Sequence, residues 1–293
     1  KNRPTGVPQG SVSALKVTIR RLGDLDPSWA ALVPPHCLID RASLGMIAEA
    51  TTSSILRQPY LDMARVNKTL SNDFAEALRA PDRLLARDTA IASTAAVLPS
   101  RPSELASLRW SDAVLTIPST ILGQQDLSVN LFDVSQDQLR SCLLDEPSFP
   151  FSVILNLRRA KNDRLGDGIP KRMQHPPGAS AWSPPRALLL HRLRSDLTNS
   201  LPTNHIFINP SGSKLSTDAV SSVLGALSVR ATGEWVTGRG WRPATASWLV
   251  ACGVPRDYVA ALGGWKSTKS LRNFYVRAVP LDAALILSIL CLP

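Results

Sequence analysis

Residues 239–254 read Arg239-Gly-Trp-Arg242-Pro-Ala-Thr-Ala-Ser-Trp-Leu-Val-Ala-Cys-Gly253-Val254. We expect a helix to begin at Pro243 and to end before Gly253, because proline favours the first turn of a helix and glycine the position after its end. Arg239 and Arg242 would then stand beside the helix N-terminus, where free backbone N–H groups and the helix dipole attract an anion. Guanidinium groups add planar, permanently charged donors that match phosphate oxygens. This stretch therefore predicts a phosphate-binding site.

Positive charge gathers in the part of the chain around this stretch. The protein has 293 residues, with 33 Lys+Arg against 23 Asp+Glu and a formal net charge of +10. Residues 151–175 carry a net charge of +4 and residues 229–277 carry +6, so these two segments account for the whole excess. A polyanionic partner explains this distribution, with nucleic acid favoured over a membrane surface. A basic protein with a solvated charged face is the alternative.

The sequence lacks the motifs of several other classes of protein. Its four histidines show no metal-binding spacing, and no phosphate loop, dinucleotide fingerprint or serine nucleophile elbow is present. The four cysteines lie far apart, which argues against a disulfide framework and favours a reducing, intracellular environment. No apolar run approaches the roughly 20 residues that a membrane span needs. We therefore expect a globular protein without metal, nucleotide cofactor or membrane anchor.

Periodicity and turn residues divide the chain into two expected domains. Residues 1–80 comprise a Pro- and Gly-rich lead-in followed by a helical segment. Residues 81–293 predict a mainly α-helical domain with a small antiparallel β-sheet, an α+β fold. Within this second domain we expect helices from Pro81 to before Pro99, from Pro184-Pro185 through Leu197 and from Ser216 onward, and strands over Leu115–Leu122, Ser152–Arg159 and Ile169–Gln174, the last two forming a hairpin.

Three further motifs accompany the arginine pair. The sequence Arg101-Pro-Ser-Glu104-Leu105-Ala-Ser-Leu108-Arg-Trp110-Ser-Asp112 follows the first of these helices, and Lys161 stands in an Arg-Ala-Lys-Asn turn. Leu262-Gly-Gly-Trp265 precedes Tyr275 by ten residues. In this order, and over roughly residues 84–290, the motifs resemble those of the tyrosine recombinases (integrases) of phages and mobile elements, in particular the Cre-like branch.

The resemblance implies that the protein breaks and rejoins DNA strands without metal or ATP. Tyr275 would be the nucleophile that forms a 3′-phosphotyrosyl link, while Arg101 and Arg242 clamp the scissile phosphate. Lys161 would protonate the departing 5′ oxygen, with Lys171 as its competitor. Supporting roles fall to Trp265 as an indole N–H donor to the phosphate, to Glu104 as the residue that orients the arginines, and to Arg239, which replaces the family's usual histidine and is a poor proton shuttle.

The same resemblance extends to partners and surroundings. It implies double-stranded DNA as the partner, residues 1–80 as a DNA-clamping segment, and a cyclic tetramer on two DNA sites assembled through the apolar C-terminal helix Leu281–Leu290. The protein would work inside the cell with DNA, in the nucleus if its source is eukaryotic. We expect further basic side chains to contact DNA, namely Arg158, Arg159, Arg164, Lys171, Lys214 and Lys266.

Other interpretations of the same residues stay open at this stage. Taken singly, Arg101 could be a helix C-cap, Lys161 a solvated turn residue, and Trp265 and Tyr275 aromatic packing; we expect Tyr258 to lie in the core. The whole protein could also be a domesticated DNA-binding module that has lost cleavage, for which Arg239 is the warning sign. A type IB topoisomerase, which shares the same set of catalytic groups, is the third possibility.

Overall fold

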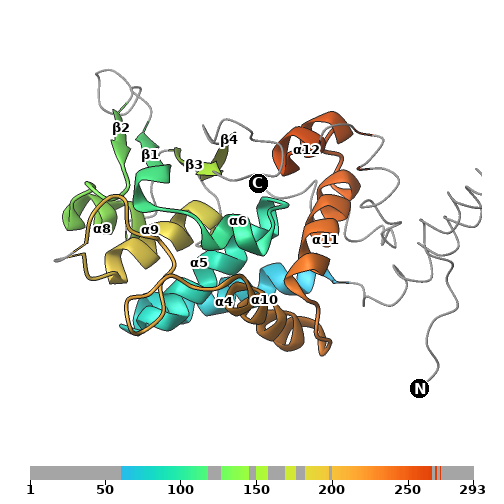
Figure 1. Cartoon of the computed structure of the whole chain (residues 1–293), viewed down its shortest axis with the longest axis horizontal. Helices are drawn as coiled ribbons and strands as arrows, with labels where there is room; N and C mark the ends of the chain where they lie inside the picture. Colours follow the sequence, from blue (N-terminus) through green and yellow to red (C-terminus); the bar gives the residue numbers. More distant parts are fainter. Residues whose placement is uncertain are drawn as a thin grey trace, which may run out of the picture. The chain divides into compact units, whose positions relative to one another are not determined.

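The protein consists mainly of helices with a small sheet at one side of them, as the computed structural model shows (Figure 1). The structure describes residues 61–117, 127–144, 150–157, 169–175, 182–197 and 200–265, together with Thr268 and Leu271. Its described helices are α4 (Met63–Arg79), α5 (Arg83–Val97), α6 (Pro102–Ala106), α8 (Gln136–Leu144), α9 (Pro184–Arg194), α10 (Thr217–Thr232), α11 (Gly238–Ala251) and α12 (Arg256–Gly263), with a short 3-10 turn at Trp110–Asp112. The expected fold class, mainly α with a small antiparallel sheet, is confirmed.

Four antiparallel strands make the sheet, in the order β2-β1-β3-β4. They are β1 (Ala113–Ile117), β2 (Leu127–Asn130), β3 (Phe151–Leu157) and β4 (Ile169–His175). The last two pair in a register that runs from Phe151 opposite His175 to Leu157 opposite Ile169, which confirms the predicted hairpin. The sequence patterns did not predict β2 or α8.

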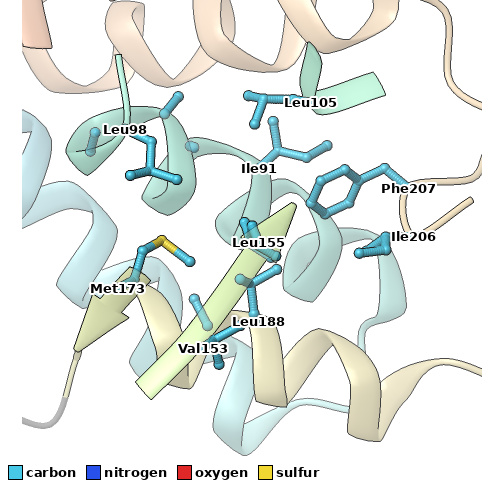
Figure 2. Packing of buried hydrophobic residues seen from close by; sticks show 14 of the residues in the cluster. Ile91, Leu98, Leu105, Val153, Leu155, Met173, Leu188, Ile206 and Phe207 are labelled. Carbon is cyan, nitrogen blue, oxygen red and sulfur yellow. The ribbon is translucent and has the colours of Figure 1, made fainter. Parts of the chain in front are cut away.

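Helix α5 lies at the centre of the packing. Asp82 caps its N-terminus by accepting hydrogen bonds from the backbone N–H groups of Leu84 and Leu85, at 2.8 and 3.0 Å. Small residues between Ala86 and Ala96 are buried, so α4, α9, α10 and α11 all pack against this helix. Figure 2 shows side chains from α5, the sheet and α9 meeting in one core, with Ile91, Leu155, Leu188 and Phe207 among the labelled residues. The predicted helix from Pro81 to Pro99 is confirmed to within two residues at each end.

Helix α4 belongs to the same packed unit as the helices that follow it. One compact unit begins at Tyr60, and within it α4 packs against α5 and α10. Arg230 of α10 holds the buried carboxylate of Asp73 in α4 through two hydrogen bonds, of 2.7 and 2.8 Å. The predicted boundary at residues 80 and 81 thus falls between two helices in mutual contact. That residues 1–80 clamp DNA stays a prediction.

Helix α11 begins five residues earlier than Pro243, where the sequence analysis placed its start. The backbone N–H groups of Gly240 and Trp241 both donate to the Thr237 carbonyl, at 2.7 and 3.2 Å, and close a first turn there. Trp241 is buried and anchors this additional turn in the core. Pro243 therefore lies inside the helix, and both Arg239 and Arg242 are helical residues.

Candidate active site

Arg101 and Glu104 form the first half of the site. Pro102 starts α6 and keeps Arg101 extended, with φ −82° and ψ 149°, because the residue before a proline avoids the helical conformation. The Glu104 carboxylate accepts one hydrogen bond from the backbone N–H of Arg101, at 2.7 Å, and another from its Nη1, at 2.5 Å. Glu104 is buried while one third of the Arg101 side chain is exposed. The buried carboxylate thus fixes the arginine and leaves part of its guanidinium open.

Arg242 enters the same place from the second turn of α11. Its Nη1 lies 3.7 Å from Glu104 Oε1, so the one carboxylate stands between two guanidinium groups. Its Nη2 donates a 2.6 Å hydrogen bond to the Gly263 carbonyl at the end of α12. Residues far apart in the sequence therefore converge, as the sequence analysis expected of Arg101, Glu104 and Arg242.

Trp265 covers the Arg242 guanidinium. The Arg242 Cζ atom lies 4.4 Å from the centroid of the indole ring, in a cation–π arrangement. Two glycines make this possible. Gly264 ends α12 with a φ of +68°, and a β-carbon on Gly263 would stand 1.9 Å from Trp265 Cζ3. The two glycines of the Leu262-Gly-Gly-Trp265 motif therefore allow the indole to fold back onto the arginine.

Lys171 is the lysine that the structure places in this cluster. It lies on β4 with 6% of its surface exposed, and its Nζ donates to the Ala261 carbonyl. It lines a small pocket together with Glu104, Gly263 and Gly264. Burial lowers the pKa of Lys171 from its ordinary value, and the nearby Glu104 carboxylate opposes this by raising the pKa. Lys171 thus lies beside Glu104 rather than in open solvent.

The alternation of β4 explains why Lys171 points inward. Lys171, Met173 and His175 are buried, whereas Arg172 and Gln174 are exposed. Side chains of a strand alternate between its two faces, so Lys171 shares its face with two core residues. That pattern was the available sequence signal for a buried lysine.

Of the other predicted site residues, the structure describes Arg239 and Lys214, and neither of these two lies in the cluster. Arg239 has an exposed side chain on the first turn of α11, and among the described residues it forms no hydrogen bond or ion pair with the cluster. Lys214 is exposed in the loop before α10 and lines a different groove. The other predicted residues lie outside the part of the chain that the structure describes, namely Tyr275, Lys161, Arg158, Arg159, Arg164 and Lys266.

Tyr258 corrects one expectation of the sequence analysis. It was expected in the core, yet 62% of its surface is exposed. The residue lies in the first turn of α12, whose buried residues are Val259 and Ala260. The helix therefore presents the next two positions inward and Tyr258 outward.

The cluster is suited to holding a phosphate. Two guanidinium groups pair with a single buried carboxylate and the Lys171 ammonium lines the same small pocket, so cationic groups are in excess, and Arg101 is open enough to receive an anion. Within the described ranges, no group of three His, Cys, Asp or Glu side chains is arranged to hold a metal ion. A search of the same ranges finds no helix with the length and apolar character needed to cross a membrane.

Comparisons with known proteins give similarity at the level of solved structures. No protein-family model and no curated protein matches the chain. The crystal structure of XerA recombinase is similar with a TM-score of 0.44 and 16% sequence identity, over 98% of this chain and 84% of that one. A lambda integrase (75–356) dimer bound to a COC′ core site is similar with a TM-score of 0.40 and 15% identity, over 96% of this chain and 85% of that one.

Proposed function

We propose that this protein cleaves and rejoins DNA strands as a site-specific recombinase or integrase of the tyrosine recombinase type. The meeting of Arg101 and Arg242 on the buried carboxylate of Glu104, beneath Trp265, is the observation that supports this most directly. A phosphodiester oxygen is the ligand that such a pair of donors fits.

The proposed reaction is an in-line transfer at phosphorus. The Tyr275 oxygen attacks the phosphorus atom and loses its proton, the bond to the 5′ oxygen breaks, and that oxygen leaves as a hydroxyl after receiving a proton. Arg101 and Arg242 would stabilise the extra negative charge of the five-coordinate phosphorus, each by about 3–4 kcal/mol if they act as oxyanion donors do. The phosphotyrosyl link conserves the bond energy, so rejoining requires the reverse transfer and no ATP.

Two lysines are candidates for the proton donor. Lys161 holds this role in our proposal because its position in the sequence, between the two strands, resembles that of the lysine in tyrosine recombinases. Lys171 is the second candidate, favoured by its buried position beside Glu104 and by its lowered pKa. A general acid works best when its pKa is near the working pH, and lowering the pKa of a lysine moves it in that direction.

The other groups would assist binding. Glu104 would hold the two guanidinium groups at a fixed separation, and Trp265 would donate its indole N–H to a phosphate oxygen. Arg239, exposed near the start of α11, would bind DNA phosphate without shuttling protons. We further propose contacts to double-stranded DNA from the basic side chains named above and a homotetramer on two DNA sites through Leu281–Leu290.

A nicked suicide duplex tests the proposal. Cleavage next to the nick releases a short strand, so the covalent intermediate accumulates as an adduct that survives SDS. We expect an adduct with the unaltered protein and none with Tyr275→Phe. Tyr258→Phe is the matched control, because Tyr258 is an exposed tyrosine on α12 that the proposal leaves without a role. An adduct that persists in Tyr275→Phe and disappears in Tyr258→Phe would overturn the assignment of the nucleophile.

The two alternative functions give different results in the same system. A DNA-binding module that has lost cleavage would bind the duplex and form no adduct. A type IB topoisomerase would form the adduct but relax supercoiled DNA as a monomer, with no pairing of two sites. A recombinase is expected to exchange strands between two sites.

A further inference from the structure

A second basic groove lies at the opposite end of α5 from the candidate active site. It has a volume of about 780 Å³ and is bordered by the first turns of α5, the end of α9 and residues 200–214. Arg101 follows the C-terminal end of α5, whereas Arg83 and Arg87 of this groove lie in its first two turns. The two basic sites are therefore separated by the length of a 15-residue helix.

Three arginines of the groove are tied to one another and to the backbone. Arg83 Nε donates to the Arg194 carbonyl at 2.9 Å, and Arg194 Nη2 donates to the Leu78 carbonyl at 3.0 Å. Arg87 Nη1 donates to the Ile208 carbonyl at 2.9 Å. These bonds occupy some of the N–H donors of each guanidinium and fix the orientation of the rest. The groups are thereby pre-organised at one end of the groove.

The carboxylates near the groove neutralise Arg87 but not Arg83. Asp88 accepts a hydrogen bond from Arg87 and pairs with its Nη2 at 2.7 Å, and the Arg87 side chain is largely buried. Asp196 lies 3.9 Å from Arg83 with both side chains largely exposed, and a distant pair of this kind contributes little. Lys214 adds another cation to the lining, so the groove retains affinity for an external anion.

His191 adds an unpaired hydrogen-bond acceptor to the lining of the groove. The residue is 5% exposed, and its ring is stacked between Trp110 and Phe207, at centroid distances of 5.8 and 5.5 Å. Burial lowers its pKa to about 4, and nearby arginines act in the same direction, so the ring is neutral at pH 7. Its Nε2 donates to the Ile206 carbonyl at 2.9 Å, which leaves Nδ1 as an acceptor with no hydrogen-bond partner among the described residues.

We propose that this groove binds a phosphorylated small molecule of nucleotide size. The side chains of Arg83, Arg194 and Lys214 would take the phosphate, and His191 Nδ1, buried in the wall of the groove, would accept a hydrogen bond from a hydroxyl or amino group of the same ligand. A bare phosphate is far smaller than the groove, and its anionic oxygens suit the unpaired acceptor poorly. A nucleoside phosphate combines a phosphate, hydroxyl or amino donors and a size typical of ligand pockets.

Titration calorimetry of the full chain, without DNA, tests the proposal. The probes are inorganic phosphate, ribose 5-phosphate and adenosine 5′-monophosphate, and we expect the nucleotide to bind more tightly than phosphate. Arg83→Gln removes a largely exposed charge and should weaken the binding of the nucleotide and of ribose 5-phosphate about tenfold, the loss expected for one charge-assisted hydrogen bond. Arg140→Gln is the charge-matched control, because Arg140 is exposed on α8 and does not line the groove.

A second variant separates the donor site from the phosphate site. His191→Gln can keep the donation to the Ile206 carbonyl while removing the Nδ1 acceptor. It should weaken binding of the nucleotide or of ribose 5-phosphate and leave that of inorganic phosphate unchanged. Absence of nucleotide binding at millimolar concentration, or an equal loss in Arg140→Gln, would overturn the proposal. The proposal would also be overturned if the groove bound a short DNA duplex in an Arg83-dependent way and bound no nucleotide. None of these measurements depends on DNA cleavage.

Discussion

Gly238 lies so close to Pro102 that a β-carbon on Gly238 would stand 2.4 Å from Pro102 Cγ. Gly238 is the first residue of α11, which carries Arg242, and Pro102 is the first residue of α6, directly after Arg101. The Gly238 N–H also donates a 2.9 Å hydrogen bond to Ser221 Oγ. The missing side chain therefore sets how closely the two helices that carry the arginines approach one another.

Gly238→Ala should separate the arginines without unfolding the protein. Overpacking of this kind costs about 1–3 kcal/mol of stability and displaces backbone, and α11 would have to move away from α6. We expect adduct formation on the suicide duplex to slow at least tenfold while DNA binding changes little. Rates per bound complex measure the effect, because they separate the position of the arginines from affinity.

Gly225→Ala is the matched control for this experiment. A β-carbon on Gly225 would also stand 2.4 Å from its neighbour, but that neighbour is the ring of Trp235, a side chain that is 52% exposed and can swing into solvent. We expect this variant to form the adduct at the normal rate. Adding Pro102→Ala to Gly238→Ala should restore part of the lost activity. Normal rates in Gly238→Ala itself would show that this contact does not position the site.

The arrangement of the main elements could be predicted from the sequence where the local signal was strong. The alanine-rich helix between Asp82 and Pro99 and the β3–β4 hairpin were found because capping, proline and strand patterns agree there. The start of α11 was missed because Pro243 is usually a first-turn residue, whereas burial of Trp241 extends the helix by a further turn. Tertiary packing here overrides a local preference.

The sequence pointed to the arginines of the site more clearly than to its lysine. The resemblance of short motifs to those of tyrosine recombinases pointed to Arg101, Glu104 and Arg242, and the structure brings these three side chains together. The choice between Lys161 and Lys171 depends on which face of β4 is buried, and that is decided by the helices packed against the sheet. Gly238 allows close contact with Pro102, which is distant in sequence, and Gly263 allows Trp265 to fold back against it. No local sequence pattern predicts either contact.

Arg242→Ala should abolish the covalent adduct while only modestly weakening DNA binding. Loss of one oxyanion donor lowers rates by a factor of about 10²–10³, whereas loss of one phosphate contact among several lowers the salt dependence of binding by about one unit of slope. Arg239→Ala is the comparison, because that side chain is exposed and separate from Glu104. If binding collapsed in Arg242→Ala and cleavage per bound complex stayed normal, Arg242 would be a binding residue only.

A substrate with sulfur in place of the departing 5′ oxygen should identify the proton donor. A thiolate leaves without being protonated, so the loss caused by removing the general acid should disappear on this substrate. We expect the sulfur substrate to restore the cleavage rate of one variant, either Lys161→Gln or Lys171→Gln. The other variant should cleave the sulfur substrate no faster than it cleaves the normal one. If Lys171 is the donor, cleavage should fall as pH rises through its pKa, which burial places below the ordinary value of 10.5. Failure of the sulfur substrate to restore either variant would exclude both lysines.

Acidification should destabilise the fold through His191. Its pKa in the folded protein is about 4 against an ordinary 6.5, because burial disfavours the charged ring. Above pH 6.5 the ring is neutral in both the folded and the unfolded chain, so this contribution to stability is fully present. As the pH falls from 6.5 to 4, the His191 ring takes up a proton in the unfolded chain but stays neutral in the folded protein. This difference lowers the free energy of unfolding by roughly 3 kcal/mol.

His191→Gln isolates this effect, since glutamine does not titrate and can keep the donation to the Ile206 carbonyl. Urea unfolding of both proteins between pH 7.5 and pH 4 measures it, and the difference between them cancels the titration of the carboxylates that they share. We expect the free energy of unfolding of the unaltered protein to fall more steeply with acidification than that of the variant. Parallel curves would mean that the ring gains its proton as easily in the folded protein as in the unfolded one. The neutral Nδ1 acceptor on which the nucleotide groove depends would then be lost at mildly acidic pH.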